Sequence, residues 1–163
     1  CTNQTVGYGE GLQRASDCEP CRPGTYCIET SVDPIDCPLG HYCPGDIAGS
    51  NGLISCPVAT YNAKIKATDA SWCLPCKSGY FCPEKGMTST YRFPTPSGHY
   101  STTGQSEPYS CPAGTFNAKS NGSSADNTAC VTCPVGHYCA STGLTAPAPC
   151  AAAAVPSAQS DAV

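Results

Sequence analysis

Large apolar side chains are sparse along this chain and never form a long run. Leu, Ile, Val and Phe together number 20 residues, about 12% of the chain, which is below the level that usually supports an apolar core. No apolar stretch approaches the length of a membrane span. Sixteen glycines and sixteen prolines interrupt the pattern, so the sequence predicts turns and short strands with little helix.

One short phrase recurs between pairs of cysteines. Gly stands at its third inner position and an aromatic residue just before the closing cysteine, as in Pro38-Leu-Gly-His-Tyr and Pro134-Val-Gly-His-Tyr. A tight turn often needs a positive φ, which Gly adopts at low cost, and the aromatic ring is placed to cover the bridge. The openings 56–64 and 111–119, which both end in Asn-Ala-Lys, predict the first strand of a small hairpin.

The cysteines repeat with a period of about 55 residues. A period of this size indicates an array whose units contact mainly their neighbours. The predicted fold is therefore a small disulfide-rich, elongated tandem array of three β-hairpin and loop repeats with little helix. Its parts are repeat 1 (1–55) with an extra half-module (37–43), repeat 2 (56–110) with a Ser/Thr/Pro-rich connector (86–110), repeat 3 (111–150) and an Ala-rich tail or linker (151–163).

The cysteine content indicates the cellular compartment. Fifteen cysteines are about 9% of the chain, which is typical of a disulfide scaffold and requires an oxidising environment outside the cell or at its surface. Two sequons agree with an extracellular location and predict N-linked glycans at Asn3 and Asn121. The net charge of −4 carries no nucleic-acid footprint, and no direct membrane span is expected in this segment.

Spacing alone leaves the disulfide connectivity open, but repeat 2 narrows it. This repeat has Thr95 and Ser101 at the two half-module cysteine positions, yet it keeps Cys76 and Cys82. If Cys76 and Cys82 normally bonded to half-module cysteines, both would be left without a disulfide partner in this repeat. A bridge between Cys76 and Cys82 themselves leaves no unpaired thiol. We therefore predict seven bridges within repeats, namely Cys1–Cys18, Cys21–Cys27, Cys37–Cys43, Cys56–Cys73, Cys76–Cys82, Cys111–Cys130 and Cys133–Cys139.

Cys150 is left over by this pairing. It begins another half-module, and its closing partner, expected near Pro156, is absent. Two outcomes are open, a bridge to an adjacent segment or a shielded free thiol, and the bridge is preferred because an exposed thiol is a liability outside the cell. We expect the array to continue head-to-tail, within a longer polypeptide or onto another subunit, and a rotation that does not close would give a helical fibre.

Two repeated phrases carry a resemblance to a known family. The sequences Cys-Pro-Ala-Gly-Thr-Phe (111–116) and Cys-Val-Thr-Cys-Pro-Val-Gly-His-Tyr-Cys (130–139), with counterparts at 56–61 and 73–82, resemble the ephrin-receptor-like cysteine-rich repeat, which is similar in style to EGF-like and TNF-receptor modules. Repeats of this kind occur in receptor ectodomains, and they are similar to arrays in large protist surface proteins, including flagellar-hair (mastigoneme) proteins. The resemblance implies a small, β-rich, non-enzymatic module.

Metal binding is the first alternative to disulfides. A zinc site would need two Cys-x2-Cys pairs about 15–20 residues apart, or one pair with suitably spaced histidines, whereas the pairs here lie about 55 residues apart. His41, His99 and His137 all occupy one Gly-His-Tyr position, which Thr25 and Tyr80 fill elsewhere. A position that accepts Thr or Tyr is structural, so we expect no metal and no cofactor.

Other candidate residues have an ordinary explanation beside a functional one. Cys150 stands among Ala and Pro without a nearby base, so it does not resemble a catalytic thiol. Asp17, Asp69 and Asp126 precede the second cysteine of a repeat, where turn formation is favoured over calcium binding. Trp72, beside Cys73, offers either part of a binding face or a cover for the disulfide.

The expected function is that of an extracellular structural and interaction module. It would be a building block of a glycosylated surface filament, coat or appendage, and its partners would be neighbouring copies or repeats of the same protein. The alternative is the ectodomain of a ligand-binding receptor or adhesin. No feature of the sequence points to an enzyme or a protease inhibitor.

Overall fold

Short antiparallel hairpins follow one another along the chain. The computed structural model describes residues 5–6, 19–28, 33–45, 52–120 and 125–150, and for residues 5–6 only the backbone. Each strand in these residues is two residues long and pairs with the strand next to it in sequence. The paired strands are β1 (Thr5–Val6) and β2 (Glu19–Pro20), β3 (Thr25–Tyr26) and β4 (Ile35–Asp36), β5 (His41–Tyr42) and β6 (Ile54–Ser55), β7 (Thr60–Tyr61) and β8 (Leu74–Pro75), β9 (His99–Tyr100) and β10 (Tyr109–Ser110), β11 (Thr115–Phe116) and β12 (Val131–Thr132), and β13 (His137–Tyr138) and β14 (Ala148–Pro149).

A further hairpin is held by a single bridge between Tyr80 and Pro94. Three turns of 3-10 helix lie in the hairpin loops, namely η2 (Ala70–Trp72), η3 (Thr90–Arg92) and η4 (Asn127–Ala129). The described residues contain no α-helix. This confirms the predicted class, a small disulfide-rich array of β-hairpins and loops.

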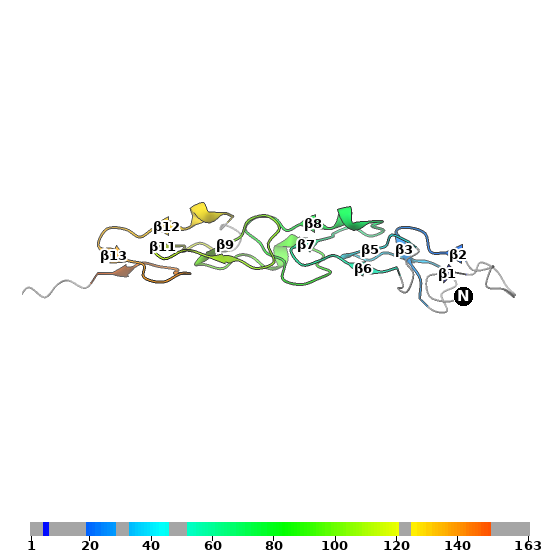
Figure 1. Cartoon of the computed structure of the whole chain (residues 1–163), viewed down its shortest axis with the longest axis horizontal. Coiled ribbons are helices and arrows are strands. Elements are labelled where there is room, and N and C mark those ends of the chain that lie inside the picture. Colours follow the sequence, from blue (N-terminus) through cyan, green and yellow to red (C-terminus); the bar gives the residue numbers. More distant parts are fainter. Residues whose placement is uncertain (1–4, 7–18, 29–32, 46–51, 121–124, 151–163) are drawn as a thin grey trace, which may run out of the picture.

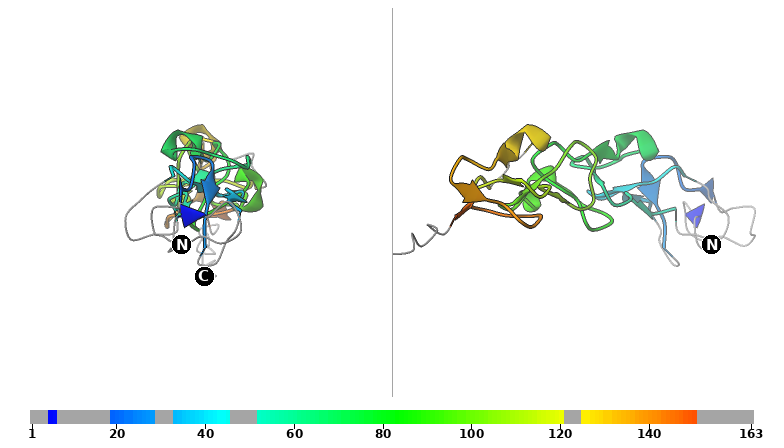
Figure 2. Two further views of the ribbon diagram at one scale, coloured as in Figure 1. Left: turned by 90° about the vertical axis from the view of Figure 1, so that its right-hand side faces the viewer. Right: turned by 60° about the vertical axis from the view of Figure 1, so that its left-hand side comes forward.

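The hairpins are strung along one axis. Figure 1 shows a rod with β1 and β2 near one end and β13 near the other, and the end-on view in Figure 2 shows its narrow cross-section. Repeat 2 contains three hairpins, β7–β8, the Tyr80–Pro94 hairpin and β9–β10. The structural unit is therefore one hairpin, about a third of the period seen in the sequence.

From β3–β4 onward, each hairpin of the described chain begins with a tight turn built on a positive φ. In Pro38-Leu-Gly-His, the amide of His41 donates to the carbonyl of Pro38 (3.3 Å) and Gly40 has a φ of 75°, which is a type II turn with Gly at its third position. The predicted need for Gly is thus confirmed. We call the residues at this position the turn residues, and they are Gly24, Gly40, Ala59, Gly79, Gly98, Gly114 and Gly136.

A repeated set of backbone hydrogen bonds joins each hairpin to the next. The amide of a turn residue donates to a carbonyl three positions beyond the next turn residue, as from Gly40 to Asn62 (2.8 Å) and from Gly98 to Asn117 (2.7 Å). We call the accepting residues, together with the equivalent residue of the β3–β4 hairpin, the bridge residues. They are Cys27, Cys43, Asn62, Cys82, Ser101, Asn117 and Cys139.

Contacts also reach the second hairpin along. A Cβ added to Gly40 would overlap the carbonyl oxygen of Gly86, and one added to Gly98 would overlap that of Gly143. Both positions therefore require Gly for close backbone approach as well as for φ. The hairpins that begin at Gly40 and Gly98 are thus in contact with both of their following neighbours, which helps a rod without a large core to hold its shape.

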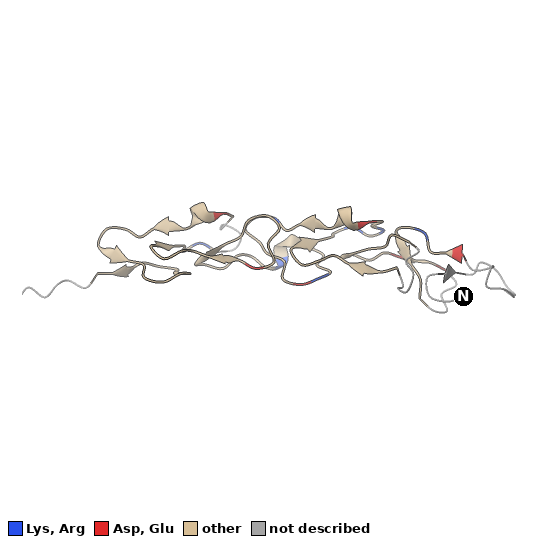
Figure 3. Cartoon of the chain, in the orientation of Figure 1, with Lys and Arg blue, Asp and Glu red and all other residues tan. Residues whose placement is uncertain are grey.

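Half-cystines form most of the interior. The buried apolar residues of the described chain are nine cysteines, Ala67 and Met87, and Met87 packs with Cys76, Cys82, Tyr61 and Phe93. Many large apolar side chains, such as Leu74, are exposed. Charged side chains are few and scattered along the rod (Figure 3), so disulfides and backbone hydrogen bonds carry its stability.

Residues 86–110, expected to act as a connector, continue the hairpin array. They contain η3, β9 and β10, and both Thr95 and Ser101 are fully buried. Two of their hydroxyl residues, Thr95 and Ser101, fill positions that are half-cystines in the β5–β6 hairpin. The tail 151–163 lies outside the described residues.

Candidate functional site

Two kinds of disulfide close the hairpins. Short bridges span six positions and join Cys21 to Cys27, Cys37 to Cys43, Cys76 to Cys82 and Cys133 to Cys139, while longer ones join Cys56 to Cys73 and Cys111 to Cys130. In the two Cys-x2-Cys pairs that the structure describes in full, Cys73 with Cys76 and Cys130 with Cys133, the neighbouring cysteines thus bond in opposite directions and hold two hairpins together. The predicted bridge Cys1–Cys18 and the sequons at Asn3 and Asn121 lie outside the described residues.

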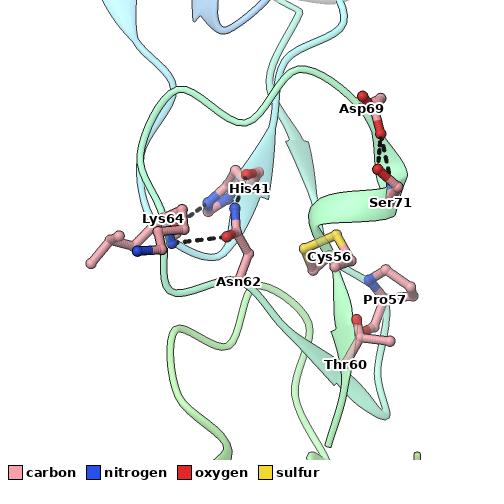
Figure 4. Close-up of a disulfide and its surroundings, with 10 residues drawn as sticks. His41, Cys56, Pro57, Thr60, Asn62, Lys64, Asp69 and Ser71 are labelled. Atoms are coloured by element: carbon pink, nitrogen blue, oxygen red, sulfur yellow. Dashed lines mark hydrogen bonds between the residues drawn. A yellow bond between two sulfur atoms is a disulfide. The ribbon is translucent and has the colours of Figure 1, made fainter.

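Asn replaces the half-cystine as bridge residue in the hairpins with a long disulfide. Asn62 is 1% exposed; its side-chain amide donates to the carbonyl of His41 (2.7 Å), and its side-chain oxygen accepts from the amide of Lys64 (2.9 Å) (Figure 4). Asn117 makes the equivalent bonds to His99 (2.8 Å) and Lys119 (2.9 Å). These buried amides therefore link adjacent hairpins where a covalent bridge is absent.

This role of Asn was not predicted from the sequence, where the shared Asn-Ala-Lys phrase indicated only part of a strand. The missing signal was the register: Asn62 and Asn117 stand six residues after Cys56 and Cys111, the same interval that separates Cys37 from Cys43.

The histidines serve the turns. The Nδ1–H of His41 donates to the carbonyl of Leu39 (2.9 Å), and that of His99 donates to the carbonyl of Ser97 (3.0 Å). At the same position, Thr25 donates its hydroxyl to the carbonyl of Arg22 (2.7 Å). Either side chain closes the same turn, which explains why the position accepts both residue types.

The aspartates predicted to form turns cap the short 3-10 helices. Asp69 accepts from the amide of Ser71 (2.9 Å) at the start of η2, and Asp126 accepts from the amide of Thr128 (2.9 Å) at the start of η4. Hydrogen bonds from the Ser71 hydroxyl, the Ser71 amide and the Thr68 hydroxyl hold the pKa of Asp69 below its ordinary value. The Thr128 hydroxyl and amide lower the pKa of Asp126 in the same way. Asp17 lies outside the described residues.

An open cleft beside η2 is the best candidate for a binding surface. It has a volume of about 510 Å³ and is lined by Tyr61, Asn62, Ala63, Lys64, Ser71, Trp72 and Leu74. Trp72 is 40% exposed and Leu74 is 50% exposed. Trp72 thus presents part of its ring to solvent, and the volume lies in the range of small-molecule and side-chain pockets.

Repeat 3 provides an internal comparison for this cleft. Its η4 turn has Ala129 where η2 has Trp72, and β12 has Val131 where β8 has Leu74. The backbone is built in the same way, because Phe116 pairs with Val131 as Tyr61 pairs with Leu74. The aromatic cleft is therefore a property of the side chains of repeat 2 and is not required by the fold.

The last described hairpin leaves one face of the array unpaired. Among the described residues, the amides of Gly136 and Cys139 have no acceptor, although the equivalent amides of Gly40 and Cys43 donate to the following hairpin. Val135, in the same turn, is fully exposed. Cys150 lies at this end of the array. Its amide donates to the carbonyl of Gly136 (2.9 Å), and its thiol is exposed and unbridged.

In the described part of the chain, no three His, Cys, Asp or Glu residues come together as a metal-binding group. No helix within the same residues is both long and apolar enough to cross a bilayer.

Comparison with known proteins gives relatives for part of the chain, and no family model matches it. A segment of 112 residues is 32% identical to rice (Oryza sativa subsp. japonica) ABC transporter G family member 25. A segment of 100 residues is 36% identical to the rat and to the mouse protein named Sushi, von Willebrand factor type A, EGF and pentraxin domain-containing protein 1. Each match covers 60% of this chain but only 10% of the rice protein and 3% of the rodent ones.

These findings identify the type of module. The chain is an array of disulfide-rich hairpins, and part of it resembles a protein named for extracellular-type domains. It is therefore a cysteine-rich repeat of the extracellular type, and its location is extracellular or secreted. The narrower assignment to the ephrin-receptor-like repeat stays a prediction.

Proposed function

We propose that this chain is a non-enzymatic structural section of a glycosylated surface filament, coat or appendage, and that neighbouring copies or repeats of the same protein are its partners. The observation that carries the proposal is the hydrogen-bond pattern between hairpins, which recurs from Gly24 to Leu144 and leaves the amides of Gly136 and Cys139 without acceptors in the described residues. A hairpin of the same kind would satisfy both amides.

Lengthwise association is the simplest use of such a face. The turn at Val135 and Gly136 offers an exposed apolar side chain next to the free amides, and addition of a further strand or loop through main-chain bonds is a common mode of protein association. An association that repeats without closing on itself gives a fibre. A bridge through Cys150 would add a covalent link at the same end.

The test is self-association of the glycosylated, disulfide-intact chain. We expect sedimentation velocity to show concentration-dependent oligomers and electron microscopy to show thin linear particles. Val135→Lys, which places a charge on the free face, should suppress them. Val58→Lys is the matched control, because Val58 holds the same turn position inside the array and is 41% exposed; it should leave assembly unchanged.

The role of Cys150 is tested in the same preparation. If the thiol links neighbouring chains, Cys150→Ser should remove a dimer band from non-reducing gels. A monomer at all concentrations, with Cys150 readily alkylated without reduction, would contradict both the fibre and the bridge.

The second candidate is the ectodomain of a ligand-binding receptor or adhesin, and the cleft at Trp72 favours it. Exposed Trp and Tyr side chains are the residues most often found at the energetic centre of binding surfaces. Trp72 is the only tryptophan of the chain, so its fluorescence reports directly on occupancy. A panel of soluble glycans and peptides should quench or shift this fluorescence if the cleft binds one of them.

A matched variant separates this candidate from the first. Leu74→Ala should weaken any such binding. Val131 holds the equivalent position in repeat 3, and Val131→Ala should leave the binding unchanged. No fluorescence change with any member of the panel, together with fibres by microscopy, would decide for the structural role.

A further inference from the structure

One stretch of the rod has no covalent restraint. The disulfides on either side of it are Cys76–Cys82 and Cys111–Cys130, and residues 83–110 between them contain no cysteine. The other unbridged stretches within residues 21–150 are much shorter, the longest being 44–55 between Cys43 and Cys56. The β9–β10 hairpin lies wholly inside the long stretch.

Two buried hydroxyl groups stand where this hairpin would have its disulfide. Thr95 and Ser101 are both 0% exposed, and neither the Oγ1 of Thr95 nor the Oγ of Ser101 has a hydrogen-bond partner. Nearby Thr90 is equally buried, but its Oγ1 accepts from the amide of Lys77 (2.9 Å). A buried polar atom without a partner costs the desolvation that a hydrogen bond would have offset. The hairpin therefore lacks a disulfide, and its two buried hydroxyl groups without hydrogen-bond partners lower its stability further.

Only non-covalent contacts keep the stretch in place. Ser101 and Gln105 accept from the amides of Gly79 (2.8 Å) and Cys82 (2.9 Å), and the rings of Tyr100 and Tyr109 pack with their centroids 5.4 Å apart. Each of these contacts is lost when the segment opens. The Tyr80–Pro94 hairpin opens with the segment, whereas β7–β8 and β11–β12 keep their loops closed by Cys56–Cys73 and Cys111–Cys130.

We propose that residues 83–110 form a built-in opening point of the rod. Under tension or mild heating this segment unfolds first and reversibly, while the disulfide-closed hairpins on both sides remain folded. A fully extended chain between Cys82 and Cys111 spans roughly 95 Å. The rod can therefore lengthen at one defined place without breaking a covalent bond.

Hydrogen exchange of the unmodified protein tests the proposal through two equivalent amides. Gly98 in the β9–β10 hairpin donates to Asn117, and Gly40 in the β5–β6 hairpin, whose turn is spanned by the disulfide Cys37–Cys43, donates to Asn62. Local opening predicts that the Gly98 amide exchanges at least about 10-fold faster than that of Gly40. Equal protection of the two amides would overturn the proposal.

A designed disulfide supplies the second test. In Thr95→Cys/Ser101→Cys the new bridge would span six positions, as Cys37–Cys43 does, and by loop-closure entropy it should slow exchange at Gly98 roughly 50-fold. The single variant Thr95→Cys is the control and should not slow it. If the bridge does not form, which a thiol assay shows, the comparison of Gly98 with Gly40 still decides the question.

Pulling on the two ends of the disulfide-intact chain gives an independent readout. The first unfolding step should lengthen the unmodified chain by no more than roughly 95 Å. In the double-cysteine variant the step should shorten by about 15 Å, because six positions are then locked in a loop whose ends stay about as close as those of Cys37–Cys43, 5.8 Å between Cα atoms. A first step of unchanged length in the bridged variant would place the opening elsewhere and contradict the proposal.

Discussion

Ala59 and Gly114 occupy the same turn position in successive repeats, with φ values of 69° and 86°. Ala59 is thus a non-glycine residue in the left-handed region, where a Cβ is unfavourable. A Cβ on Gly114 would meet no atom within 4 Å. A methyl group added at Gly114 would therefore introduce backbone strain without a steric clash.

Exchanging these two residues should shift stability in opposite directions. Ala59→Gly should stabilise the chain by about 1 kcal/mol and Gly114→Ala should destabilise it by about the same amount. Thermal unfolding under non-reducing conditions measures both. Ala63→Gly, at an exposed position without a positive φ, is the control and should be slightly destabilising.

Thr95 and Thr90 offer a second opposed pair. Thr95→Val removes a buried hydroxyl that has no partner, so we expect a gain of about 1 kcal/mol. Thr90→Val removes the acceptor of the Lys77 amide, so we expect a loss of about 1–2 kcal/mol. A loss of stability in Thr95→Val, measured by denaturant unfolding, would show that its hydroxyl is satisfied in solution.

The buried bridge residue Asn62 should be among the least replaceable polar residues of repeat 2. Asn62→Ala removes its bonds to His41 and Lys64 and leaves the His41 carbonyl without that donor, which should cost about 2–3 kcal/mol. Asn117→Ala should behave alike. Lys64→Ala, whose side chain is exposed, should change the free energy of unfolding very little.

Acid should weaken the caps of η2 and η4. Because the folded-state pKa of Asp69 and Asp126 lies below the ordinary value, each carboxylate stabilises the fold above its unfolded pKa, and this contribution is lost as the pH falls through the folded pKa. Both groups are exposed, so the effect is small. The double variant Asp69→Asn/Asp126→Asn should show a flatter decline of melting temperature below about pH 4. An identical decline in both proteins would contradict this.

The structural features that depend on cysteine and glycine, namely the tight turns and the hairpin openings, were predictable from the sequence. The turn at Gly40 and the hairpin openings before Asn62 and Asn117 follow from local chemistry, because positive φ and strand signals act within a few residues. The links between hairpins could not be predicted in this way. They are backbone bonds, such as that from Gly98 to Asn117, and the backbone bonding of distant residues leaves no trace in the residue types.

The candidate binding surface was only partly visible in the sequence. Trp72 was singled out by its type, but its partners Tyr61 and Leu74 are brought to it by the pairing of β7 with β8. The buried state of Thr95 and Ser101 was equally hidden, because a Ser/Thr/Pro-rich composition is typical of linkers. Their alignment with Cys37 and Cys43 was the better guide.

The repeated backbone hydrogen bonds between successive hairpins also make the length of such a protein easy to change. Gly79 donates to Ser101, and Gly98 donates to Asn117, through the same backbone atoms. If residues 95–110 were deleted, Gly79 would meet Asn117 in the place of Ser101, and the bonding pattern would remain complete. Genes for such rods can therefore gain or lose single hairpins, in steps of 16 to 22 residues between successive hairpin starts, without inventing a new interface.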